Sequence, residues 1–203
     1  MDITVVGAGP VGRALMERLA GGHTVTLAAR DPGADSVVAA REQLDDRIDV
    51  RAVPDALAGA DAVLLAIPGG GVTEFIEAYG TALDGRLVID ATNDLRADGP
   101  LNHVADWQRL APGAVVARAF CSLGWENIAA PVYSGIAATL FWCGPDGEAG
   151  GRVEAIGRHV GLDPVRIGGL EAADTLDGLA RLWFQLAFAQ GMGRRLGFRL
   201  LRD

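Results

Sequence analysis

A glycine-rich stretch near the start of the chain is the clearest chemical signal in the sequence. It has the spacing G-x-G-x-x-G, and its residues are Gly7, Ala8, Gly9, Pro10, Val11 and Gly12. In such a turn the first glycine permits a tight bend, the second lets a pyrophosphate approach, and the third lets a helix pack closely. An apolar run precedes the turn and a helical pattern follows it. We therefore predict a dinucleotide site here, with a purely structural glycine turn as the alternative.

The residue after the second expected strand predicts which dinucleotide binds. That strand ends in Ala28, Ala29 and Arg30. Arginine suits the 2′-phosphate of NADP through charge-assisted hydrogen bonds, whereas NAD sites usually place an acid there. Asp31 follows, and we interpret it as a helix N-cap with Pro32 in the first turn. We predict NADP, but a register shifted by one residue would favour Asp31 and NAD.

Two later strand ends are expected at the same edge of the sheet. Ile67 and Pro68 precede three consecutive glycines, and Ala91 and Asn93 follow the fifth strand. Ligands of open parallel sheets bind beyond the carboxyl ends of the strands. We predict that these four residues contact the cofactor near its nicotinamide, although the glycines could also form a flexible loop.

The segment after the sixth expected strand faces the same cleft and is the predicted substrate pocket. Its candidate residues are Cys121, Ser122, Leu123 and Trp125. Aromatic bulk beside a thiol and a hydroxyl suits a second ring lying on the nicotinamide. The alternative is that Phe120 and Trp125 only pack against the C-terminal helix.

The residue types that are missing also restrict the chemistry. All 18 basic residues are arginine, so Schiff-base chemistry, a P-loop lysine and tyrosine–lysine pairs are excluded. Three histidines and two cysteines make a metal site improbable, and we predict none. His103 and His159 are expected at the surface, and His23 lies away from the ligand edge. No catalytic side chain is identified, but direct hydride transfer between two rings needs alignment more than acid–base groups.

The elements that position these residues alternate between strand and helix. Apolar runs at residues 3–6, 24–28, 50–52, 62–67, 87–89 and 114–117 have helical patterns between them. This alternation predicts an α/β fold with a doubly wound, mainly parallel Rossmann-type sheet. We expect a dinucleotide-binding domain at residues 1–120, and a substrate-pocket and dimerisation portion at residues 121–203. That portion includes one long helix over residues 176–201.

Charge and composition point to a cytoplasmic protein. The 203 residues carry a formal charge of −8, which argues against nucleic-acid and anionic-membrane partners. Neither a signal peptide nor a membrane span is evident. The C-terminal helix is apolar nearly all round, so we predict a homodimer through it, with Trp183 and Phe184 as anchors.

Several of these stretches together resemble the NADPH-dependent deazaflavin (coenzyme F-420) reductases. They are the glycine turn, residues 28–32, residues 89–93, residues 119–127, and residues 182–191. The resemblance implies that hydride passes directly between NADPH and a deazaflavin, and that the chain forms a dimer. The chain departs from the family at Ala29, where relatives often have serine, and at residues 69–71, where they carry bulkier residues.

Two other functions remain open from the residues. One is an NADPH-dependent reductase of a small imine or carbonyl substrate, for which Ser122, Tyr133 or Cys121 would supply the proton. The other is a non-catalytic redox sensor that binds the dinucleotide without turnover.

Overall fold

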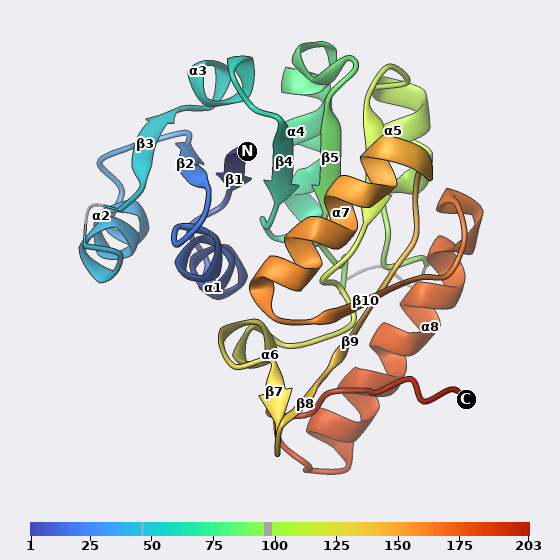
Figure 1. Ribbon diagram of the computed structural model, residues 1–203. Helices are drawn as coiled ribbons and strands as arrows, with labels where there is room; N and C mark the ends of the chain where they lie inside the picture. Colours follow the sequence, from blue (N-terminus) through green and yellow to red (C-terminus); the bar gives the residue numbers. More distant parts are fainter. Residues whose placement is uncertain (46, 96–98) are drawn as a thin grey trace.

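The computed structural model describes residues 1–45, 47–95 and 99–203, and its centre is a six-stranded parallel sheet (Figure 1). The strand order is β3-β2-β1-β4-β5-β6, and every pairing is parallel. The strands are β1 (Asp2–Val6), β2 (Thr24–Ala29), β3 (Asp49–Ala52), β4 (Ala62–Leu65), β5 (Leu87–Asp90) and β6 (Val115–Arg118). This is the doubly wound Rossmann order, so the predicted fold class is confirmed.

Alternation along the strands places apolar side chains on both faces of the sheet. Val5 and Leu64 belong to one core cluster, whereas their neighbours Val6 and Leu65 belong to the other. Every residue of β4 and β5 is buried. Continuous apolar runs are typical of parallel strands covered on both sides, which explains why these segments lack an alternating pattern.

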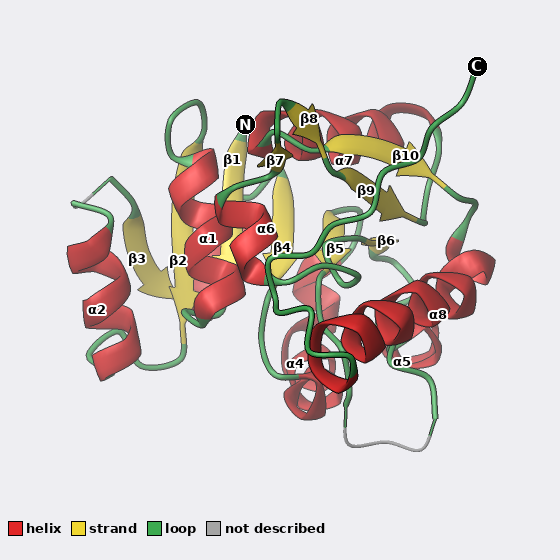
Figure 2. Ribbon diagram, turned by 90° about the horizontal axis from the view of Figure 1, so that it is seen from below, coloured by secondary structure: helices red, strands yellow, loops and turns green. Residues whose placement is uncertain are grey.

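Helices cover both faces of the sheet (Figures 1 and 2). One face packs against α1 (Pro10–Leu19), α2 (Asp35–Gln43), α6 (Trp125–Ala129) and α7 (Gly147–Val160). The other face packs against α3 (Val53–Ala58), α4 (Val72–Tyr79) and α5 (Val104–Leu110). Residues after β6 contribute Phe120, Ile128 and Trp142 to the first core, so the N-terminal and C-terminal parts share buried surface.

The chain after the sheet forms short strands and one further helix. These elements are β7 (Val132–Tyr133), β8 (Ile136–Ala137), β9 (Thr139–Trp142), β10 (Asp163–Arg166) and α8 (Ala173–Phe184). β9 and β10 pair in parallel, and an isolated bridge joins Arg118 to Cys143. Helix α8 lies beside the end of the sheet that carries β6 (Figure 2).

The predicted helix start at Asp31 is wrong. Helix α2 begins at Asp35 with Ala34 as its N-cap. The Oδ1 atom of Asp31 instead accepts a hydrogen bond from the Gly33 N–H at 2.9 Å. A short aspartate side chain readily closes such a turn with the backbone two residues later, and this turn delays the helix.

The predicted helix over residues 176–201 is too long. The α-helix ends at Phe184, a π-helical turn covers Gln185–Ala189, and the remaining residues run without helix (Figure 1). Gly191 and Gly193 have φ angles of 65° and 80°, a left-handed conformation that ends helices. The last segment then lies against the start of β9, where the Thr139 N–H donates to the Phe198 carbonyl at 2.8 Å. Its arginines therefore do not lie at a helix C-terminus.

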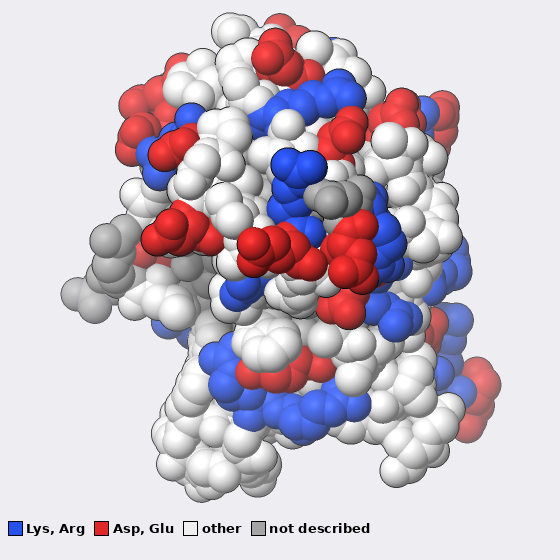
Figure 3. Space-filling view, turned by 90° about the vertical axis from the view of Figure 1, so that its left-hand side faces the viewer, with Lys and Arg blue, Asp and Glu red and all other residues white. Residues whose placement is uncertain are grey.

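Charge is mixed on the surface that carries α2 and β3. Figure 3 shows acidic and basic side chains interleaved on this face, without a broad patch of one sign. Within the described part of the chain, no helix is both long and apolar enough to span a bilayer.

A buried ion pair joins the sheet to α8. Arg118 ends β6, and its guanidinium Nη2 lies 2.7 Å from Oδ1 of Asp177, with side chains only 1% and 5% exposed. Arg118 also donates to the Thr92 carbonyl and to Oδ1 of Asn93, each at 2.7 Å. The other oxygen of Asp177 accepts hydrogen bonds from the N–H groups of Leu101 and Asn102. Both charges are thus paired and hydrogen-bonded, as burial requires.

Removing one partner of this pair is expected to destabilise the fold strongly. The substitution Arg118→Met leaves the Asp177 carboxylate buried without its cation, which costs on the order of 3–5 kcal/mol of unfolding free energy. Urea denaturation followed by circular dichroism measures the loss. Arg109→Met is the matched control, because Arg109 pairs with Asp106 at the surface and is 60% exposed; its effect should be below about 1 kcal/mol. Equal effects of the two substitutions would contradict a central role for the buried pair.

Candidate dinucleotide and substrate site

Two adjoining cavities lie at the carboxyl ends of the strands. The first has a volume of about 580 Å³ and is lined from the ends of β1, β2 and β4 and from α4. The second has a volume of about 250 Å³ and is lined from the segments after β4, β5 and β6 and from α8. Ala66, Ile67 and Pro68 line both cavities. Together they form one extended site at the sheet edge where Rossmann folds bind their ligands.

The glycine turn lies between β1 and α1, as predicted. Gly7 has a φ angle of +117°, and a Cβ atom there would lie 2.5 Å from the Ala66 carbonyl oxygen. A Cβ atom on Gly12 would lie 2.0 Å from the Gly7 carbonyl oxygen. These two glycines are therefore required for close packing of backbone on backbone.

Gly9 is different because nothing lies within 4 Å of its would-be Cβ atom. It is the N-cap of α1, lines the first cavity, and has Pro10 after it in the first turn. The first turn of α1 has no acidic residue and no side-chain cap. The positive end of the helix therefore faces open space that a side chain would fill. That is the arrangement a dinucleotide pyrophosphate needs.

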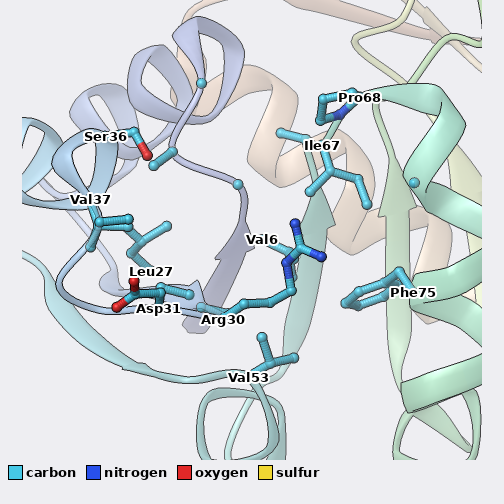
Figure 4. Close-up of a pocket in the computed structure, with 18 of the residues that line it drawn as sticks. Val6, Leu27, Arg30, Asp31, Ser36, Val37, Val53, Ile67, Pro68 and Phe75 are labelled. Carbon is cyan, nitrogen blue, oxygen red and sulfur yellow. The ribbon is translucent and has the colours of Figure 1, made fainter.

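Arg30 and Asp31 both line the first cavity, and they point in different directions. Figure 4 shows the Arg30 guanidinium extending between Ile67 and Phe75, whereas the Asp31 carboxylate lies toward Leu27 and Val37. The described residues that line this cavity include one basic residue, which is Arg30. It is highly exposed, with 82% of its side chain accessible, and its guanidinium lies 3.9 Å from the Glu74 carboxylate.

The first cavity also has apolar walls that the sequence interpretation did not identify. Val37 comes from α2, Val53 from the start of α3, and Phe75 and Tyr79 from α4. The rings of Phe75 and Tyr79 lie 5.2 Å apart, as their spacing of four residues on a helix permits. Apolar walls with a few polar groups are typical of nucleotide pockets. The i, i+4 aromatic pair after the glycine loop was the sequence signal for this wall.

The second cavity brings together most of the residues predicted for the nicotinamide and the substrate. The predicted residues that line it are Val11, Ile67, Pro68, Ala91, Asn93, Cys121, Leu123 and Trp125. Ser122, which was predicted with them, is buried and is not among the lining residues. Phe120, also in the wall, has a φ angle of 62°. A bulky residue in this strained region is uncommon, and such residues concentrate at functional sites.

Among the lining residues that the sequence analysis did not assign to this cavity, three come from the C-terminal part of the chain. Trp183 and Phe184 reach it from α8, and Arg194 reaches it from the C-terminal segment. The Arg194 guanidinium lies 5.6 Å from the centre of the Phe188 ring and also pairs with Glu126. The sequence analysis assigned Trp183 and Phe184 to a dimer contact, and it placed Arg194 in a helix because the turn at Gly191 and Gly193 was not predicted.

Asn93 lines the cavity but its amide is already occupied. Its Nδ2 donates to the Cys121 carbonyl at 2.8 Å, and its Oδ1 accepts from Arg118. The side chain therefore ties the segment after β5 to the segment after β6. It shapes the wall, with Oδ1 and one N–H of Nδ2 used in these hydrogen bonds.

The described lining of the second cavity offers no group that exchanges protons near neutral pH. Burial raises the pKa of the Cys121 thiol to about 12, so it stays protonated. The Thr92 hydroxyl is already engaged, because it donates to Asp90 at 2.6 Å. The described lining of this cavity includes one charged residue, which is Arg194. This arrangement can align rings, but it does not supply an acid–base pair.

The remaining candidate groups lie elsewhere. The rings of His23 and His159 contact each other in a tilted arrangement with centres 4.5 Å apart, outside both cavities, and burial lowers the pKa of His23. His103 precedes α5 and is buried, which contradicts the expected surface position. Burial also raises the pKa of the free thiol of Cys143, to about 11. Among the described residues, no group of three or more metal-ligating side chains is found.

Comparison with known proteins finds a family model that matches the N-terminal part of the chain. Residues 2–94 match the model of the family described as "NADP oxidoreductase coenzyme F420-dependent". A glycerol-3-phosphate dehydrogenase, NAD(P)+, of Ruegeria sp. (strain TM1040) is 30% identical over 208 residues. That alignment covers 97% of this chain and 63% of the relative, so the chain spans less than two thirds of this relative's length.

Solved structures show the same fold. A protein of Arthrobacter sp. FB24, assigned as an F420-dependent NADP-reductase, superposes with a TM-score of 0.82 at 24% identity, covering 98% of this chain and 99% of that one. An imine reductase of Streptomyces aurantiacus superposes with a TM-score of 0.67 at 22% identity, covering 96% and 69%. At these identities the two likenesses establish the fold and not the reaction.

Filling the open space at Gly9 is expected to abolish dinucleotide binding while leaving the fold intact. In Gly9→Val the added side chain occupies the space before α1 that a pyrophosphate needs, and it meets no protein atom. Fluorescence titration with NADPH measures binding, and the melting temperature reports the fold. Gly21→Val, at an equally open position in the turn before β2, is the control and should bind normally. Tight NADPH binding by Gly9→Val would place the cofactor elsewhere.

Proposed function

We propose that this chain transfers hydride directly between NADP(H) and a deazaflavin, a proposal supported by the match of residues 2–94 to the family of coenzyme F420-dependent NADP oxidoreductases. The observation that carries the proposal is the second cavity. It is walled by aromatic and small residues, adjoins the dinucleotide cavity, and offers no proton-exchanging side chain among its described residues. Hydride transfer between two flat rings needs this kind of aligned and shielded space.

The residues fit a dinucleotide on structural grounds. The open space at Gly9 admits a pyrophosphate, and the uncapped first turn of α1 provides N–H groups for it. Arg30 offers a guanidinium for a 2′-phosphate, and the apolar walls of the first cavity suit the adenine ring. When bound, NADPH supplies the hydride, so the protein itself has to bind and align the two rings.

The chain's own residues would then hold the second ring. Trp125, Trp183 and Phe184 give flat apolar surfaces, and Ala91 leaves room beside the backbone. The hydrogen bond from Asn93 to the Cys121 carbonyl joins the segment after β5 to the segment after β6. These contacts orient the acceptor and exclude water, which is the contribution that the site can make to the rate.

Reduction of a small imine or carbonyl is less well supported. The Tyr133 hydroxyl hydrogen-bonds to Asn127, burial raises its pKa, and it does not line either cavity. Ser122 does not line them either, and Cys121 holds its proton too tightly to donate readily. Tyr133 and Ser122 are therefore poorly placed for this reaction, and Cys121 lines the cavity but is a weak acid.

We expect sustained turnover when the protein is mixed with NADPH and an oxidised deazaflavin. The deazaflavin absorbance should fall at a rate proportional to enzyme, and Gly9→Val should be inactive in the same assay. Turnover on imines or ketones but not on a deazaflavin would favour the small-substrate reductase. Binding of NADPH without turnover on any acceptor would indicate a redox sensor.

We also propose a homodimer that forms through α8 and the turn after it. Leu182, Phe188 and Met192 are 46%, 56% and 61% exposed and lie on this segment. Of the two expected anchors, Trp183 is buried within its own subunit and donates to the Leu196 carbonyl, and Phe184 is half-buried and lines the second cavity. The exposed apolar side chains need a partner, and an equivalent surface across a two-fold axis supplies one.

Light scattering tests the dimer. A mass near twice 21.1 kDa is expected, and Phe188→Arg should shift the protein to monomer because it places a charge at the apolar contact. The control Leu201→Arg changes a residue that is 82% exposed at the end of the chain, and it should leave the mass unchanged. A wild-type mass near 21.1 kDa at all concentrations would rule out the dimer.

A further inference from the structure

The first cavity contains an acidic residue that faces its cation. Glu74 lies in the first turn of α4 and lines the same cavity as Arg30. Its Oε1 atom is 3.9 Å from Nη1 of Arg30, and the two side chains are 80% and 82% exposed. Because this ion pair is so exposed, it contributes little to folding stability. Both side chains line the cavity, so the pair can act on a ligand that binds there.

The net negative charge of the lining of the first cavity disfavours an anionic group such as a 2′-phosphate. The charged residues among its described lining are Arg30, Asp31 and Glu74, so two carboxylates accompany one guanidinium. Asp31 lies on the Leu27 side and is engaged with the Gly33 N–H (Figure 4). Glu74 is therefore the carboxylate that competes directly for Arg30.

We infer that Glu74 sets the cofactor preference of this chain by holding the Arg30 guanidinium and repelling a 2′-phosphate. This inference rests on the proposed dinucleotide function. A 2′-phosphate that binds Arg30 has to displace Glu74 and then remain a few ångströms from its charge. NAD has only a hydroxyl at that position and meets neither cost. The wild type therefore discriminates weakly between the two dinucleotides, although it has an arginine at the end of β2.

The geometry makes this effect specific to the phosphate. The Glu74 carboxylate pairs with the Arg30 guanidinium, whereas the glycine turn serves NAD and NADP alike. A charge change at residue 74 should therefore alter NADP binding and leave NAD binding nearly unchanged. The interaction crosses solvent, so salt should weaken it.

Isothermal titration of Glu74→Gln with NADP+ and with NAD+ tests the inference. We expect the NADP+ dissociation constant to fall about three- to tenfold at low salt, the size of a partly screened charge interaction. The NAD+ constant should change less than about twofold, and the NADP+ gain should shrink in 0.5 M salt. Glu77→Gln is the matched control: it removes the same charge from the same helix at a residue that does not line the cavity.

The outcomes separate this inference from the proposed function. If both dinucleotides bind the wild type and Glu74→Gln leaves the NADP+ constant unchanged, or shifts both constants equally, the role of Glu74 is overturned and the function stands. If Glu77→Gln gives the same gain, the effect is one of net charge and the assignment to Glu74 also fails. If neither dinucleotide binds the wild type, the proposed function fails and the inference fails with it. Unchanged melting temperatures for both variants will show that the fold is not the cause.

Discussion

The buried pair of Arg118 and Asp177 is the interaction on which the C-terminal half of the molecule depends. Two opposite charges removed from water are tolerated only when each is paired and its remaining hydrogen-bonding capacity is used. Arg118 meets this condition by donating to Asp177, to the Thr92 carbonyl and to Asn93. Asp177 meets it through Arg118 and the loop before α5. One cation therefore joins the sheet, the loop after β5, and α8.

That pairing also explains how the second cavity is built. Its walls come from segments that are far apart in sequence, most of which lie just beyond the strand ends. Asn93 joins two of these segments, because it accepts from Arg118 and donates to the Cys121 carbonyl. Helix α8 carries Trp183 to the cavity and Asp177 to Arg118. The interaction that anchors the helix thus also positions the aromatic wall.

The two cavities use the backbone in different ways. At the dinucleotide turn, Gly7 and Gly12 bring main chain against main chain, and Gly9 leaves space open. At the second cavity, Phe120 keeps a left-handed backbone conformation and side chains form most of the wall. A phosphate is recognised by backbone N–H groups and dipoles, whereas a flat ring needs apolar surface. The different construction follows from the different ligands that each part would hold.

The sequence by itself determined the α/β fold, the glycine turn and the position of Arg30 at the end of β2. These features depend on local patterns: apolar runs, glycine spacing, and the rule that parallel strands end at one edge. Sequence patterns could not reveal the partnership of Arg118 with Asp177, which are 59 residues apart. They also could not place Trp183 and Arg194 in the cavity, nor Glu74 against Arg30. Such contacts carry no periodic signature, because they arise only when separate elements pack. The end of α8 is an intermediate case: Gly191 and Gly193 are visible in the sequence, but the contact of the last segment with Thr139 is a tertiary one.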